Sequence, residues 1–212
     1  MWSNYYNAPV LYTNLMIRYV LFGFFWAIAV YVYNSAIARA WKRVNFGTCV
    51  VYFFVVAAIG LYGEVFLNTT YNALVGNPLW YYHIAPIRGG YTSSFAIVTW
   101  GLFGVHLYLM HDTLRSRWQI TRARHLALIV SMEALALEAL LTLSAKPVFG
   151  TYMYYYLPGD LWHVTSLQNL PFYFIFGVVA VKTLQRARID RHFYTIASIF
   201  LLVVMIMLNY AI

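Results

Sequence analysis

Charged side chains are scarce in this sequence. Asp, Glu, Lys and Arg make up 9% of its 212 residues, whereas a soluble domain normally carries about 25%. Hydrophobic residues make up 63%, which is more apolar surface than a soluble fold of this length can hide from water. The composition excludes an ordinary soluble domain and predicts a single integral membrane domain over residues 1–212.

Cysteine is almost absent as well. The single Cys49 lies in an apolar run, so no internal disulfide can form and a buried, inert thiol is expected. The sequence has no paired cysteines and no His-x-x-x-His motif, and we expect no metal and no cofactor. His106 lies within an apolar run, where we favour a hydrogen-bonded core histidine over a haem or metal ligand.

Six long apolar runs are present instead. Each is close to the about 20 residues that a helix needs to cross a bilayer. They lie at 15–35, 47–67, 91–111, 125–145, 169–184 and 193–211. Inside lipid every backbone amide needs an internal partner, so each run is predicted to be a helix. The predicted fold is all-α, a polytopic membrane protein with six transmembrane helices.

The basic residues predict how the chain is oriented in the membrane. Most of them lie after the first, third and fifth runs, at 39–43, 115–124 and 182–191. The positive-inside rule places these segments in the cytoplasm. The N- and C-termini and the two longer loops, 68–90 and 146–168, are then predicted on the outer side. This distribution accounts for the net charge of +8, so nucleic acid is not expected as a partner.

The two outer loops are rich in aromatic residues and carry matching features. Loops that only connect helices are richer in Gly, Ser and charge. Either these loops fold against the bundle, or their aromatic side chains form a belt at the membrane interface. The matching positions are Glu64 and Glu138, Pro86 and Pro158, and Thr92 and Thr165, which are 74, 72 and 73 residues apart.

The spacing predicts an internal repeat. Its two-helix units cover about 47–111 and 125–184, so that helices 2 and 3 match helices 4 and 5. Both units start from the cytoplasmic side, which makes them parallel repeats related by a pseudo-two-fold axis along the membrane normal. Sites in such proteins lie at the interface between the repeats.

Three carboxylates lie within the predicted spans. A charge at membrane depth costs about 2.5–3.5 kcal/mol on insertion scales, so such residues face the bundle interior and are usually functional. Glu64 and Glu138 are the first catalytic candidates, on the walls of a polar pocket that opens outward. Glu133 is a weaker candidate, which we assign to substrate binding. The alternative is that each glutamate pairs with Arg88, His83 or His163 and only fixes a loop to a helix.

Further candidate residues lie in the outer loops. Asp160 and His163 are catalytic candidates, because with Thr165 they could form a base and its orienting partners. Ser93 or Ser166 could be a nucleophile, but no Gly-x-Ser-x-Gly motif is present and we favour helix capping by both Thr-Ser pairs. Asn68-Thr69-Thr70 fits a glycosylation sequon. Substrate-binding candidates are Trp80, Tyr82, His83, Arg88, Tyr155 and Trp162.

A short pattern in the first repeat unit resembles a known membrane-protein group. Gly63-Glu64, Trp80, Pro86, Gly90 and Thr92-Ser93 are similar to the TMEM229 and CmpB-like proteins, as is a later helix with Glu138. The resemblance covers about 60–180, and the segment Pro158 to His163 departs from it. That group is labelled an ABC-transporter component of type IV, yet this sequence contains no Walker loop. The resemblance therefore bears on architecture and not on activity.

Three functions are compatible with these features. The first is an intramembrane enzyme that uses glutamate acid/base chemistry on a lipid-like or other apolar substrate. The second is a small carrier or permease component, although no pair of broken helices supports it. The third is a structural or assembly subunit of a membrane complex. The expected partners are membrane lipids, an apolar small molecule, and a second copy of the chain or a partner membrane protein.

Overall fold

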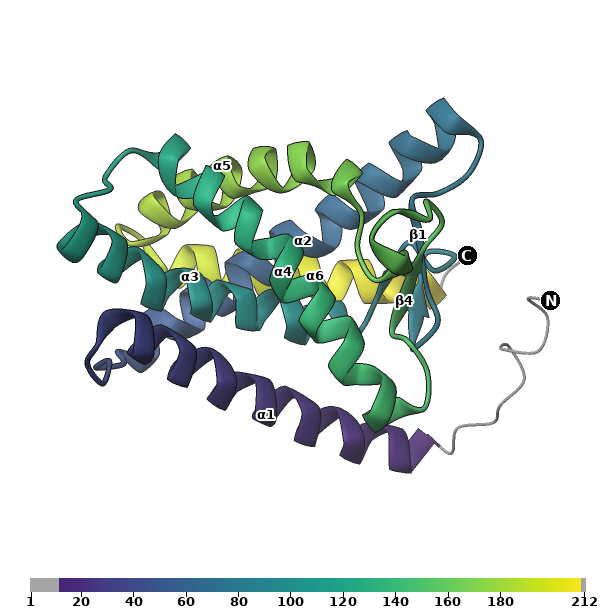
Figure 1. Cartoon of the computed structure of the whole chain (residues 1–212), viewed down its shortest axis with the longest axis horizontal. Helices are drawn as coiled ribbons and strands as arrows, with labels where there is room; N and C mark the ends of the chain where they lie inside the picture. The colour runs from purple at the N-terminus through teal and green to yellow at the C-terminus, as the bar shows by residue number, and fades with distance from the viewer. Residues whose placement is uncertain (1–11, 211–212) are drawn as a thin grey trace.

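The computed structural model describes residues 12–210, which form six long helices. The helices are α1 (Tyr12–Ala38), α2 (Phe46–Val75), α3 (Ala96–Trp118), α4 (Ala123–Phe149), α5 (Leu170–Ala187) and α6 (Arg191–Tyr210). Each predicted apolar run overlaps one of them, although the run 91–111 includes a short strand at its beginning and its helix starts at Ala96, and the all-α fold is confirmed. The helices run lengthwise through the molecule (Figure 1).

Five helices are long and apolar enough to cross a membrane, namely α1, α2, α4, α5 and α6. This supports an integral membrane protein. The remaining helix, α3, has 23 residues, but its second half carries His111, Asp112 and two arginines. Six spans therefore stay a prediction. The termini lie outside the described residues, and the predicted orientation stays open.

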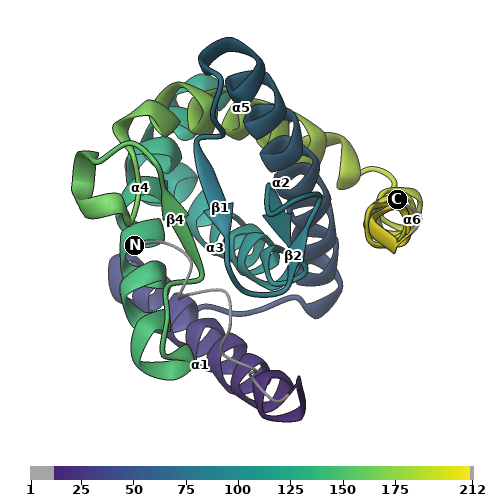
Figure 2. The ribbon, with the colours of Figure 1, turned by 90° about the vertical axis from the view of Figure 1, so that its right-hand side faces the viewer.

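Four helices form the centre of the bundle. α2 packs on α3, α4 packs on α5, and α2 also contacts α5. α1 lies across α3 and α4, while α6 packs on the outside of α2 (Figure 2). Large apolar side chains on α1 and α6, such as Phe24 and Phe200, are exposed, as lipid-facing residues would be.

Glycines allow α2 and α3 to approach closely. Gly60 faces the Trp100 ring, and Gly104 faces the backbone oxygen of Tyr52. A Cβ atom at Gly104 would lie 2.3 Å from that oxygen, so no larger residue fits without moving a helix. This contact positions α3, which carries several residues of the site.

The segments at one end of the bundle fold into short strands. β1 (Trp80–Tyr82) pairs antiparallel with β4 (Tyr154–Tyr156), and β2 (Pro86–Ile87) pairs with β3 (Thr92–Ser93). β1 and β4 lie side by side across the end of the helix bundle (Figure 2). Trp80, Tyr82, Tyr154 and Tyr156 are buried, so these loops fold against the bundle and their strands are not an aromatic belt.

Asn68 holds the beginning of the first strand segment. Its amide oxygen accepts the N–H of Leu79 at 2.8 Å, and its amide nitrogen donates to the carbonyl of Trp80 at 3.1 Å. The side chain is fully buried. The sequon at this position is therefore a structural asparagine, and its amide is not accessible for glycosylation.

Candidate functional site

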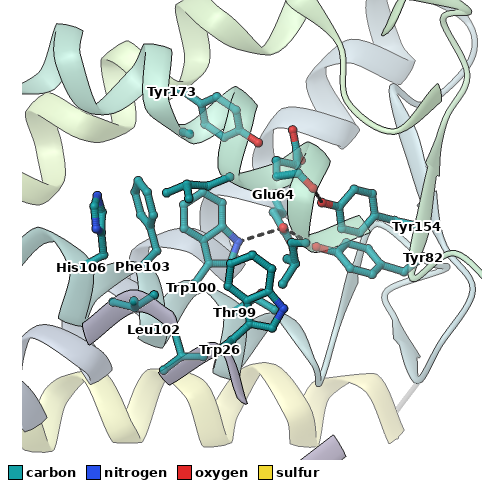
Figure 3. A pocket seen from close by; sticks show the side chains of 15 residues that line it. Trp26, Glu64, Tyr82, Thr99, Trp100, Leu102, Phe103, His106, Tyr154 and Tyr173 are labelled. Carbon is teal, nitrogen blue, oxygen red and sulfur yellow. Dashed lines mark hydrogen bonds between the residues drawn. The ribbon is translucent and has the colours of Figure 1, made fainter. Parts of the chain in front are cut away.

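Glu64 is buried on α2 and accepts three hydrogen bonds. The Tyr82 hydroxyl donates to Oε1 at 2.6 Å, and the Trp100 indole donates to the same oxygen at 2.9 Å (Figure 3). The Thr92 hydroxyl donates to Oε2. β1, β3 and α3 thus each supply one donor to this carboxyl group.

Glu138 has a similar set of partners on α4. The Tyr156 hydroxyl donates to Oε1 at 2.6 Å, and the Thr165 hydroxyl donates to Oε2. Tyr173 on α5 is a further hydrogen-bonding partner. The Asn169 amide in turn donates to the Tyr156 hydroxyl, so the phenol is fixed from both sides.

Among residues 12–210, neither carboxyl group has a cationic partner. Within this part of the chain, Lys42 forms an ion pair with Asp112 and the His106 imidazole contacts Glu133, and neither contact involves Glu64 or Glu138. The ion pairs of residues 12–210 thus do not join the glutamates to Arg88, His83 or His163. The tyrosine and threonine donors nevertheless fix a loop to a helix at each glutamate, so the structural alternative stays open. Burial raises the pKa of Tyr82 and Tyr156 well above that of an ordinary phenol, so both hydroxyls stay protonated and act as donors. A carboxyl group held by neutral donors can exchange a proton without breaking an ion pair.

Both glutamates line one cavity of about 100 Å³. Its walls are mostly apolar and aromatic and come from all four central helices and from α1 (Figure 3). Tyr82 and Tyr154 line it from β1 and β4, so strands lie across the end toward which we predicted it to open. The other wall residues are Trp26, Val30, Thr99, Trp100, Leu102, Phe103, His106, Ala134, Leu137, Leu141 and Tyr173.

His106 is a hydrogen-bonded core residue. The Asn34 amide nitrogen donates to the carbonyl of Val30 at 2.8 Å and lies 2.9 Å from Nδ1 of His106. Since that nitrogen can only donate, Nδ1 is the acceptor and the ring proton is on Nε2. Nε2 then donates to Glu133, 3.0 Å away, which leaves no ring nitrogen free for a ligand.

Glu133 does not line the cavity. It accepts the Tyr33 hydroxyl and the imidazole of His106, and so joins α1, α3 and α4. Within residues 12–210, no group of three or more His, Cys, Asp or Glu side chains is arranged to hold a metal ion.

The loop candidates Asp160 and His163 lie apart from the cavity. Asp160 accepts the Ser166 hydroxyl at 3.1 Å and the N–H of Leu167 at 2.8 Å. His163 bonds to the carbonyl of Tyr156 and stacks on Tyr155 with ring centres 4.2 Å apart. The structure does not bring this pair together with the two glutamates, and its catalytic role stays a prediction.

The predicted substrate-binding residues divide into two groups. Tyr82 lines the cavity, and Trp80 lines a smaller neighbouring space that both glutamates also border. The others do not line either one: Tyr155 contacts His163, Trp162 is 85% exposed, the backbone of His83 donates to Met153, and that of Arg88 donates to Asn209.

The two Thr-Ser pairs do different things from what capping predicts. Ser166 caps the short 3-10 turn Leu167–Asn169 before α5, and Ser93 accepts the N–H of Phe95. Each serine binds a free amide, but α3 and α5 themselves begin after Phe95 and Asn169 without a side-chain cap. Each threonine donates to a glutamate, so the prediction that the Thr-Ser pairs cap these two helices is wrong. Trp100 and Tyr173 were not among the predicted site residues, although they lie 73 residues apart and extending the repeat into the following helices would align them.

Comparisons with known proteins do not assign this site. No family model matches the chain, and neither the curated proteins nor the solved structures contain a match. The resemblance to the TMEM229 and CmpB-like group therefore stays a prediction.

Proposed function

We propose that this protein is an intramembrane enzyme that uses Glu64 and Glu138 in acid/base chemistry on an apolar, lipid-like substrate. One observation carries the proposal: two carboxyl groups, neither with a cationic partner among residues 12–210, line the same apolar cavity. Isolated carboxyl groups at membrane depth are costly and are usually retained for function. Catalytic acids and bases are typically held in such dry, shaped sites.

We further propose that units 47–111 and 125–184 are parallel repeats. The donors to the two glutamates support this, because a tyrosine lies 18 residues after each glutamate and a threonine 28 or 27 residues after it. α2 and α4 both end at a glycine with positive φ, Gly76 and Gly150. β1 and β4 pair antiparallel about Tyr81 and Tyr155, as a two-fold axis between the units requires.

The cavity lies where the two proposed units differ. Phe172 and Phe176 border the small space between α2 and α5. At the positions 73 residues earlier, α3 has Thr99 and Phe103, which line the larger cavity. The shorter Thr99 side chain leaves room where Phe172 fills it. Trp26 and Val30 of α1 border that room, so its nearest membrane-facing wall is a lipid-exposed helix.

This geometry favours a thin, unsaturated substrate. Typical ligand pockets hold about 300–1,000 Å³, so a cavity of about 100 Å³ fits only a slender segment of a larger molecule. A protonated carboxyl group can add a proton to one carbon of a double bond, which leaves a carbocation beside it. The second group, as a carboxylate, removes a proton from a neighbouring carbon, so the double bond moves or a ring closes. Trp100 and Tyr173 would stabilise the cation through their ring faces.

Proton exchange with solvent tests this chemistry directly. The purified protein is incubated in heavy water with polyprenols, sterols and polyunsaturated lipids, and mass spectrometry measures deuterium bound to carbon. We expect one lipid class to gain deuterium with the native protein, and Glu64→Gln and Glu138→Gln to abolish the gain. Glu133→Gln is the matched control, because Glu133 lies on the same helix as Glu138 and outside the cavity. Thr99→Phe should also block the reaction by filling the cavity.

A carrier is the second candidate, because two similar carboxyl sites also suit proton-coupled transport. It predicts no deuterium on carbon and a pH-dependent flux in vesicles that both Gln substitutions remove. If the native protein gives neither deuterium nor flux, and all variants fold alike, the enzyme proposal fails and a structural subunit is favoured.

A further inference from the structure

The end of the bundle opposite the strands contains a second hollow. The connections α1–α2, α3–α4 and α5–α6 lie at this end (Figure 1). The hollow has a volume of about 230 Å³ and a mostly polar lining. Its charged and polar residues come from the α1–α2 connection, the last turns of α3 and the end of α5: Lys42, Arg43, His111, Asp112, Arg115 and Arg188.

Positive charge dominates this hollow. The Lys42 ammonium is paired with the Asp112 carboxylate at 3.0 Å, so these two charges offset each other. The three arginines have no carboxylate within ion-pair distance among residues 12–210. Three guanidinium groups around one concave space repel one another unless an anion lies between them.

Hydrogen bonds within the protein hold two donors of the hollow, Arg188 and His111, in place. Arg188 donates through Nε to the hydroxyl of the buried Tyr52 at 3.0 Å, and another of its nitrogens lies 3.1 Å from Nδ1 of His111. A guanidinium can only donate, so Nδ1 of His111 accepts and its ring proton is on Nε2. The imidazole therefore adds a neutral donor beside the charged ones.

Helix ends and membrane orientation explain part of this charge, since cations complement helix C-termini and cytoplasmic segments are basic. They do not explain the concave arrangement. Arg122 and Arg124 lie near the beginning of α4 in the same end of the bundle, and they do not line the hollow. Only some of the basic residues at this end of the bundle therefore line the hollow.

We infer that this hollow binds a phosphate group, as a soluble phosphate or as the headgroup of an anionic lipid. Arginine forks match phosphate oxygens with paired charge-assisted hydrogen bonds. The three arginines and His111 offer such donors from the α1–α2 connection, α3 and the end of α5. The site is independent of the proposed acid/base chemistry, because its residues do not line the glutamate cavity.

Binding to a matched pair of variants tests the inference. Arg43→Gln/Arg115→Gln removes two lining charges, and Arg122→Gln/Arg124→Gln removes two charges outside the hollow. Each purified protein is titrated with inorganic phosphate, and native mass spectrometry counts phosphatidylglycerol retained from nanodiscs against phosphatidylcholine. Unfolding curves confirm that the variants are folded.

We expect one phosphate-bearing ligand per native chain, roughly tenfold weaker binding in the lining variant, and unchanged binding in the control. Retained phosphatidylglycerol that phosphate does not displace identifies a lipid site, and displacement by phosphate identifies a soluble ligand. Equal losses in both variants would reduce the effect to net charge and overturn the inference. Absence of binding by the native protein would overturn it as well.

Discussion

The tyrosine partners of the two glutamates have different positions relative to the cavity. Tyr82 donates to Glu64 and lines the main cavity, whereas Tyr156 donates to Glu138 and borders only the smaller space. Both phenols stay protonated, because burial raises their pKa. The Tyr82 hydroxyl can therefore contact a substrate as well as orient a carboxyl group.

Tyr82→Phe should lower the rate of deuterium incorporation about tenfold, which corresponds to one lost hydrogen bond of about 1.4 kcal/mol. Tyr156→Phe should have a smaller effect, because its hydroxyl acts from outside the main cavity. Tyr155→Phe is the control. Tyr155 lies on β4 between the buried Tyr154 and Tyr156, does not line the cavity, and stacks on His163. Equal rates in all three variants would remove Tyr82 from the site.

At this scale the sequence predicted the acids but few of their partners. Glu64 and Glu138 could be found because carboxylates are rare in apolar runs. Trp100, Tyr156 and Tyr173 could not be separated from the many other aromatic residues, since only the fold determines which ring points toward a carboxyl group. His83, Arg88 and Trp162 were chosen for their chemistry, and the structure places them away from the cavity.

The helices could be predicted from the sequence and the short strands could not, for a physical reason. The six helices follow from apolar runs, which are local signals. β1 and β4 have three residues each and pair across 74 positions, so no local pattern marks them as partners. The close contact of α2 and α3 depends on glycines whose spacing alone does not show what they face.

Gly104→Ala tests this contact. Its Cβ would lie 2.3 Å from the backbone oxygen of Tyr52, and backbone cannot yield without separating α2 from α3. We expect a loss of about 1–3 kcal/mol, as overpacking typically costs, measured by unfolding in detergent. Because α3 carries Thr99, Trp100 and Phe103 of the cavity wall, deuterium incorporation should fall too.

Gly47→Ala is the control on α2, since its Cβ would meet the nearest atom at an ordinary 3.6 Å. It should leave stability within about 0.5 kcal/mol, as expected away from packed contacts. Stability of Gly104→Ala equal to that of the native protein would show that the helices are not in this close contact.

The whole molecule combines two differently built ends. Strands and buried aromatic residues close one end, and arginines surround a hollow at the other. The positive-inside rule predicts that the arginine end is cytoplasmic. That orientation would bring the hollow to the leaflet surface that is usually anionic, and it would turn the strand end outward.

Single cysteines measure this orientation and the number of spans together. In a Cys49→Ser background, Leu74→Cys and Arg122→Cys flank α3, and Trp162→Cys and Ile189→Cys flank α5. Leu74 lies in the last turn of α2, and Trp162 and Ile189 lie outside the long helices; they are 81%, 85% and 88% exposed, so we expect a membrane-impermeant maleimide to reach them. In intact cells we expect label at 74 and 162 only, with 122 and 189 labelled after permeabilisation.

The inverse pattern would reverse the orientation and place the phosphate hollow outside. Label on the same side at 74 and 122 would mean that α3 does not cross the membrane, because only that helix connects those ends. The glutamate cavity would then lie beside a helix that enters the bundle without spanning it, and water could reach the carboxyl groups from that side.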